Sequence, residues 1–215
     1  MRGCGFDGAS VMSGANTGVA ARIRVHSPHC QYMHCRCHCL ALASVETARQ
    51  FPRMLKVFNF FTTLWKFFAF SAPRTHRLEQ IQTILNMREY KTLKPSDTRW
   101  LANDRACTAI INNLTALVTT TEDLHQTLGD SDALGLAKTM RLPDTVAGVH
   151  LLGDVLDILA KLNASLQSKS ANLGDFDILV SAARSKLQAI IDSPRETLAY
   201  RQWVEVFKEP THWRR

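Results

Sequence analysis

The sequence predicts a mainly α-helical protein with one or two short strands near its N-terminus. Only residues 1–39 show an α/β pattern: a short run ending at Phe6 leads through a turn of small residues to a helix expected over 16–24 and a strand over 31–37. From residue 40 onward the apolar residues recur at helical spacing.

Prolines divide the first part of the helical region. A helix over 40–50 ends ahead of Pro52, which suits the first turn of the next helix because its missing N–H needs no partner there. Pro73 opens a helix over 74–87 in the same way. A polar connection over 88–96 then marks a boundary.

Acidic residues mark the next helix starts. Asp97 is placed to cap one long helix over 98–126. The acidic pair at 130 and 132 begins a helix that ends before Pro143. Two later stretches, 152–166 and 176–190, have apolar residues three and four apart and predict an antiparallel helical hairpin. A last helix is expected over 195–208, followed by a tail over 209–215.

Composition sets broad limits on function. The chain has 215 residues, of which 46% are hydrophobic and 21% charged, as in ordinary globular proteins. Its net charge of +7 favours acidic partners such as nucleic acid without requiring them. The most apolar stretch, 54–72, contains Lys56 and Lys66, so no membrane partner is expected. Four of the six cysteines crowd between Cys30 and Cys39, which fits a reducing compartment better than a disulfide framework.

Three segments carry a family resemblance, and they occur in the family's order. Residues 7–20 form an acidic residue followed by a Gly/Ala/Ser turn, 34–42 contain Cys35 and His38 ahead of Leu40 and Leu42, and 94–100 end in Thr-Arg-Trp. These segments resemble the second catalytic-aspartate motif, the Cys-x-x-His-x-Leu-x-Leu element and the Thr-Arg-Trp element of hAT-superfamily transposases. The domesticated vertebrate members of that superfamily are the most similar.

The resemblance implies a division of the chain. Residues 1–39 would be part of an RNase H-like catalytic core, 40–208 a helical insertion domain and 209–215 a tail. Intact relatives cut DNA with two Mg²⁺ ions held by two aspartates and one glutamate, and Asp7 matches the second aspartate. Because one carboxylate cannot hold two metal ions, we expect Asp7 to be a vestige and the chain not to be an enzyme. The alternative is that Asp7 is a turn or helix-cap residue.

Zinc is a second possible metal. Cys35 and His38 have usable zinc-ligand spacing, and cysteine and histidine crowd this part of the sequence. On a strand, however, Cys35, Cys37 and Cys39 would share one face, with His38 on the other. We therefore favour cysteines packed beside a structural histidine over a zinc site, and no cofactor is assigned.

Arg99 and Trp100 are the candidate nucleic-acid-binding residues. An arginine beside an aromatic ring suits a phosphate contact and stacking on a base. The resemblance places this tryptophan in the insertion domain facing DNA. The alternative is a tryptophan buried at a helix start. By contrast, we expect the aromatic residues over 51–70 to be core residues, because they recur at helical spacing.

The expected function is binding of DNA or of protein partners in the nucleus, without catalysis. The family dimerises through a C-terminal region that is not recognisable here, so no oligomeric state is predicted. The alternatives are a helical protein-interaction scaffold with no nucleic-acid role, or a gene remnant without function. A DNA-binding protein should gather its basic residues on one face, whereas a scaffold should scatter them, and the residues to compare are Arg22, Arg24, Arg53, Lys56, Arg74 and Arg99.

Overall fold

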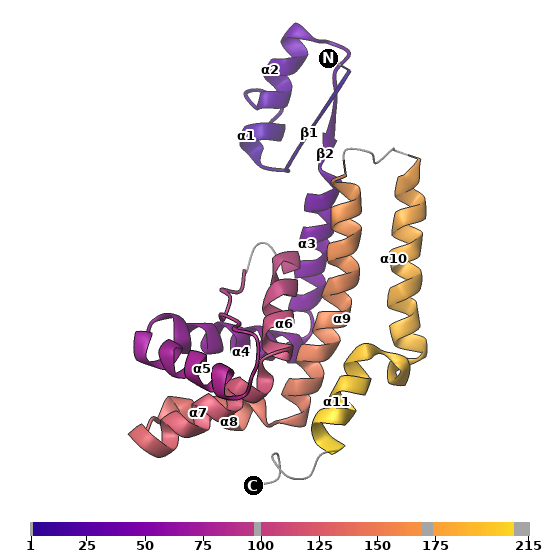
Figure 1. Ribbon diagram of the computed structural model, residues 1–215. Coiled ribbons are helices and arrows are strands. Elements are labelled where there is room, and N and C mark those ends of the chain that lie inside the picture. The colour runs from indigo at the N-terminus through magenta and orange to yellow at the C-terminus, as the bar shows by residue number, and fades with distance from the viewer. Residues whose placement is uncertain (1, 97–99, 169–173, 209–215) are drawn as a thin grey trace.

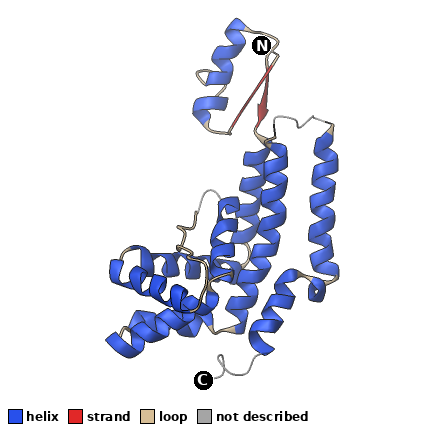
Figure 2. Ribbon diagram, viewed as in Figure 1, coloured by secondary structure: helices blue, strands red, loops and turns tan. Residues whose placement is uncertain are grey.

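A computed structural model describes residues 2–96, 100–168 and 174–208. The described chain is mainly helical, with eleven α-helices and one parallel sheet of two short strands, which confirms the predicted class (Figures 1 and 2). Both strands lie at one end of the molecule, in a small N-terminal unit that stands beyond the helical body (Figure 2). The RNase H-like assignment of this unit remains a prediction.

The N-terminal unit has a strand–helix–strand arrangement. Strand β1 (Gly3–Phe6) is followed by the short helix α1 (Ser10–Ser13), helix α2 (Val19–His26) and strand β2 (Gln31–His34). The two strands are parallel and in register from Gly3 opposite Gln31 to Phe6 opposite His34. Since a parallel connection needs a crossover of a dozen or more residues, the α1–α2 segment supplies it.

Glycine is required where α1 meets α2. A Cβ atom on Gly18 would lie 2.5 Å from the backbone nitrogen of Gly14, and one on Gly14 would lie 2.5 Å from the carbonyl oxygen of Ser10. Backbone atoms cannot move aside as a flexible side chain does. The small residues that open the sequence therefore allow the two helices to turn back against each other.

The helical body contains nine helices among the described residues, and Figure 1 shows them below the N-terminal unit. A 3₁₀ turn, η1 (Trp100–Asn103), precedes α6, and a second one, η2 (Pro194–Glu196), precedes α11. The helices are α3 (Arg36–Arg49), α4 (Pro52–Ala69), α5 (Ala72–Ile84), α6 (Asp104–Ile111), α7 (Leu114–Leu128), α8 (Ser131–Met140), α9 (Pro143–Leu166), α10 (Asp175–Asp192) and α11 (Leu198–Lys208).

Helix α9 is the centre of this body. It packs against α3, α4, α6, α8, α10 and α11. Its buried apolar side chains recur every three to six residues, so one face stays in the core from end to end: Val146, Val149, Leu152, Leu156 and Leu162. The antiparallel α9–α10 hairpin is confirmed (Figure 1). Only Ala183 of α10 is buried, so α10 lies on the outside.

The aromatic residues of α4 form much of the remaining core, as the spacing predicts. Phe60, Phe61, Phe67 and Phe68 are buried. The aromatic residues at the two ends of this stretch are the exceptions, with Phe51 57% and Phe70 76% exposed. Among the described residues, no helix is long and apolar enough to span a lipid bilayer.

The expected strand over 31–37 is three residues too long. The amide of Cys35 donates to the carbonyl of Phe6 at 2.8 Å, which is where β1 ends, so β2 has no partner beyond that point. The chain then turns into α3, in which the amide of Cys39 bonds the carbonyl of Cys35. The idea that three cysteines share a strand face is wrong for the same reason, since Cys37 and Cys39 are helical.

The single helix expected over 98–126 is also wrong. Within the described residues this region contains η1, α6 and α7 instead, and the break between the two helices falls at Asn112 and Asn113. Asparagine disfavours helix interiors because its side chain competes for backbone hydrogen bonds. The proposed cap at Asp97 lies outside the described residues.

One ion pair joins α5 to α8. The guanidinium of Arg74 lies 2.7 Å from Oδ2 of Asp130 and 3.9 Å from the ring centre of Phe67. The other oxygen of Asp130 caps α8 by accepting the amides of Asp132 and Ala133 at 3.0 and 3.1 Å. Burial by itself raises the pKa of Asp130, but the Ala133 amide and the Arg74 guanidinium outweigh it, so the pKa lies below its ordinary value of 3.8.

This lowered pKa predicts acid sensitivity. The unfolded state takes up the proton near pH 3.8 while the folded state does not, so the free energy of unfolding should be fully present above that pH and fall as the pH drops below it. Asp130→Asn should cost about 1 kcal/mol at pH 7 and flatten this acid dependence. Urea unfolding between pH 3 and 7 measures both, with the exposed Asp192→Asn as control. An unchanged acid dependence in Asp130→Asn would contradict the assignment.

The central position of α9 predicts a contrast between two leucines. Leu156 is fully buried on α9, whereas Leu128 at the end of α7 is 72% exposed. Leu156→Ala should lower the free energy of unfolding by about 2–5 kcal/mol because it leaves a cavity in a packed core. Leu128→Ala should change it by less than about 0.5 kcal/mol. Urea unfolding of the two variants checks this, and equal losses would show that α9 does not carry the core.

Candidate functional site

Asp7 directly follows β1 and is exposed. Its Oδ1 accepts the amide of Ala9 at 3.4 Å, and its backbone carbonyl accepts the hydroxyl of Tyr32 at 3.1 Å. These are the contacts of a turn residue, the alternative that the sequence left open. A two-metal site needs several carboxylates aimed at one point. The surroundings of Asp7 do not fit one, because no group of three or more metal-ligating residues occurs in the described part of the chain.

Cys35 and His38 lie where β2 gives way to α3. Cys35 is the N-cap of α3, and the ring of His38 lies 5.4 Å from that of His34. The ring of His34 in turn covers Gly8, where a Cβ atom would come within 2.9 Å of it. Nε2 of His34 is buried without a hydrogen-bond partner among the described residues. The imidazole rings of His34 and His38 therefore pack together near the carboxyl ends of the two strands.

The neighbouring thiol of Cys37 faces α9. Burial first, and then the Cys35 thiol, raise the pKa of Cys37. The Sγ of Cys37 lies 3.9 Å from the carbonyl of Asn163, which it faces as a weak donor. This part of α3 thus contacts α9 through its cysteine.

The structure brings two of the three motif segments to one groove. The groove lies between α3, α6, α9 and the connection that enters η1. Arg99 lies outside the described residues, and of Trp100 only the backbone, at the start of η1, is described. Their neighbours line the groove together with the second motif, and the lining residues are Cys37, His38, Ala41, Leu93, Lys94, Leu101, Asp104, Arg105, Ala160, Asn163 and Gln167.

The groove is lined by apolar and polar residues, and its described charged residues are two basic and one acidic. Lys94 and Arg105 are exposed, and Asp104 is the one acidic residue among its described lining residues. Burial first, and then the charge of Asp157, raise the pKa of Asp104, while Lys161 and Arg105 act in the opposite direction. The wall from α9 supplies the neutral amides of Asn163 and Gln167. Such a surface suits a backbone of phosphates better than a cation.

The connection into η1 places cations beside aromatic rings. Nζ of Lys94 lies 5.4 Å from the ring centre of Trp65, and the guanidinium of Arg88 lies 5.7 Å from that of Tyr90. Positive charge over a ring face is stabilised by the ring quadrupole. Lys94 belongs to the third motif segment, which ends in Thr-Arg-Trp. Arg105, Asn163 and Gln167 are not predicted from the sequence, because nothing local in α6 or α9 marks them.

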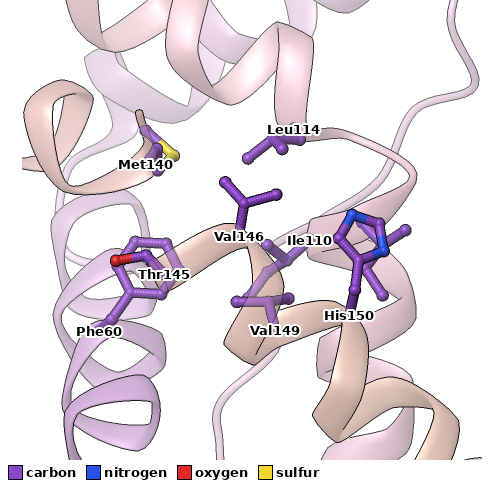
Figure 3. A pocket seen from close by; sticks show the side chains of 9 residues that line it. Phe60, Ile110, Leu114, Met140, Thr145, Val146, Val149 and His150 are labelled. Carbon is purple, nitrogen blue, oxygen red and sulfur yellow. The ribbon is translucent and has the colours of Figure 1, made fainter. Parts of the chain in front are cut away.

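A second cavity lies inside the core, and Figure 3 shows its lining. Its accessible volume is only about 10 Å³, which is room for about one water molecule. Its walls are apolar apart from Thr145 and His150. Burial lowers the pKa of His150, and its Nδ1 lies 2.9 Å from Oε1 of Gln202, which links α9 to α11. This cavity is too small for a substrate.

Of the basic residues to be compared, the five that the structure describes do not gather on one face. Arg22 and Arg24 lie on α2 in the N-terminal unit, whereas Arg53 and Lys56 lie at the start of α4 in the helical body (Figure 1). Arg74 is held in its ion pair with Asp130. A DNA-binding protein was expected to gather these residues on one face, so their scatter favours a protein-interaction scaffold. The groove differs, because it brings Lys94 and Arg105 together.

No family model, curated protein or solved structure matches the chain. The resemblance to hAT transposases therefore stays a prediction that depends on the three sequence segments.

Proposed function

We propose that the chain is a nuclear, non-catalytic nucleic-acid-binding protein of hAT transposase ancestry, whose α3–α6–α9 groove holds the phosphates of a strand. One observation carries the proposal: two segments chosen from the sequence, around His38 and Lys94, line the same groove although they lie 56 positions apart in the chain. A shared ancestral surface would bring them together, whereas a chance likeness to two short motifs would not.

The chemistry of the groove supports the same function. Phosphate contacts come mainly from lysine and arginine, and from amides and other polar groups. Lys94 and Arg105 supply the charges, and Asn163 and Gln167 the amides. Asp7 is not among the lining residues of the groove, and its contacts are those of the turn after β1. Binding rather than catalysis is therefore the activity that we assign.

A protein-interaction scaffold is the second candidate. The scatter of the basic residues favours it, as do apolar side chains that α10 and the start of α11 leave exposed: Ile178, Val180, Ile191 and Leu198. A partner protein on that side would leave the groove unused. The two candidates therefore predict binding on different helices.

Binding of single-stranded and hairpin DNA across a salt series separates them. We expect affinity to fall steeply as salt rises, because bound phosphates release counterions. Lys94→Ala and Arg105→Ala should each reduce the slope of log affinity against log salt by about 0.7. Trp100→Ala should weaken hairpin binding without changing the slope. Fluorescence anisotropy measures all of these.

Lys138→Ala is the matched control, because Lys138 is exposed on α8, away from the groove. It removes the same charge and should leave the slope unchanged. If the folded protein binds no DNA even at low salt, the nucleic-acid function is wrong and the scaffold is left. If all three charge variants lose affinity equally, binding is diffuse and the groove is not the site.

A further inference from the structure

Two aromatic rings at the end of α4 stand outside the core. Phe70 follows the last residue of α4 and is 76% exposed, and Trp65 is partly buried. Neither belongs to the core cluster that holds the other aromatic residues of this helix. Their rings meet edge to face with centres 5.4 Å apart, a favourable geometry for an aromatic pair. Trp65 therefore supports the ring of Phe70 at the surface.

Lys94 connects this aromatic pair to the groove. Its Nζ lies 5.4 Å from the ring centre of Trp65, and the same lysine lines the groove between α3, α6 and α9. Lys66, which follows Trp65 in the chain, is exposed as well. Within the described residues, neither lysine is held in an ion pair. The two rings are thus flanked by positive charge that continues into the groove.

Exposure by itself does not mark a binding residue, because single apolar residues are common on protein surfaces. Phe51, at the other end of α4, is 57% exposed and has no ring or cation contact among the described residues. Phe70 differs in two respects. Trp65 holds its ring, and a lysine of the groove lies over the ring of Trp65.

We propose that Phe70, backed by Trp65, stacks on an unpaired base of a nucleic-acid strand whose phosphates lie along Lys94 and the groove. The inference rests on the proposed function and names its ligand as single-stranded. Proteins that bind single strands combine a positively charged groove with exposed aromatic rings on which bases stack. Since Lys94 covers the ring of Trp65, Phe70 supplies the exposed ring. A duplex keeps its bases stacked on one another and gains nothing from Phe70.

Two strands of equal charge test the stacking at fixed salt: a dT 12-mer, and a 12-mer of abasic sugars that keeps the phosphates and lacks the bases. The dT strand should bind about tenfold tighter. Phe70→Leu removes the ring and keeps an apolar side chain at an exposed position, so the fold should not change. It should lower the affinity for the dT strand about fivefold and leave the affinity for the abasic strand and the salt slope unchanged.

Phe51→Leu is the matched control, because it makes the same change at the exposed residue that opens α4. It should bind both strands as the unmodified protein does. If the two strands bind equally, or Phe70→Leu keeps its affinity for the dT strand, the stacking is wrong and the proposed function stands. If Phe70→Leu weakens both strands equally, or Phe51→Leu has the same effect, Phe70 does not contact a base. If neither strand binds, the proposed function and the stacking both fail.

Discussion

Helix α9 buries apolar side chains along most of its length, and six helices pack on it: α3, α4, α6, α8, α10 and α11. Val146 and Val149 near its start belong to the same core cluster as the α4 aromatic residues, and Leu162 near its end is also buried. Burial of a leucine side chain is worth about 1.5–3 kcal/mol, so this seam is a large part of what holds the body together. Helices that are far apart in sequence, such as α3 and α6, line one groove because each packs on α9 and on η1.

The groove follows from that arrangement. Residues of α3, α6 and α9 line it together, because α3 and α6 both pack on α9. The connection over residues 88–96 then crosses beside it, held by bonds from Gln82 to the carbonyl of Tyr90 and from Asn103 to both backbone groups of Ser96. The buried amides of Gln82 and Asn103 thus fix the segment that brings Lys94 to the groove. Packing of the core and position of the candidate site are linked through these two residues.

Periodicity and proline placement were enough to predict most helices. The spacing over 152–190 predicted the hairpin, and Pro52 the start of α4. Pro143 was expected only to follow the end of α8, whereas it also begins α9. The wrong predictions, the strand over 31–37 and the single helix over 98–126, have local structural causes that the spacing of apolar residues does not reveal. Strand β2 stops where its partner β1 stops, and two asparagines end α6 although the apolar period runs on. The groove could be foreseen only in part, because Arg105, Asn163 and Gln167 become neighbours of His38 through tertiary packing.

The central claim is that nucleic acid binds where the two motif segments meet. Hydrogen exchange of the full chain with and without a single-stranded DNA tests it most directly, because it reports every helix at once. The account predicts slower exchange in three separated stretches, 36–41, 93–105 and 160–167. Protection confined to α10 and α11, or spread evenly over the basic residues of α2, α4 and α5, would contradict it.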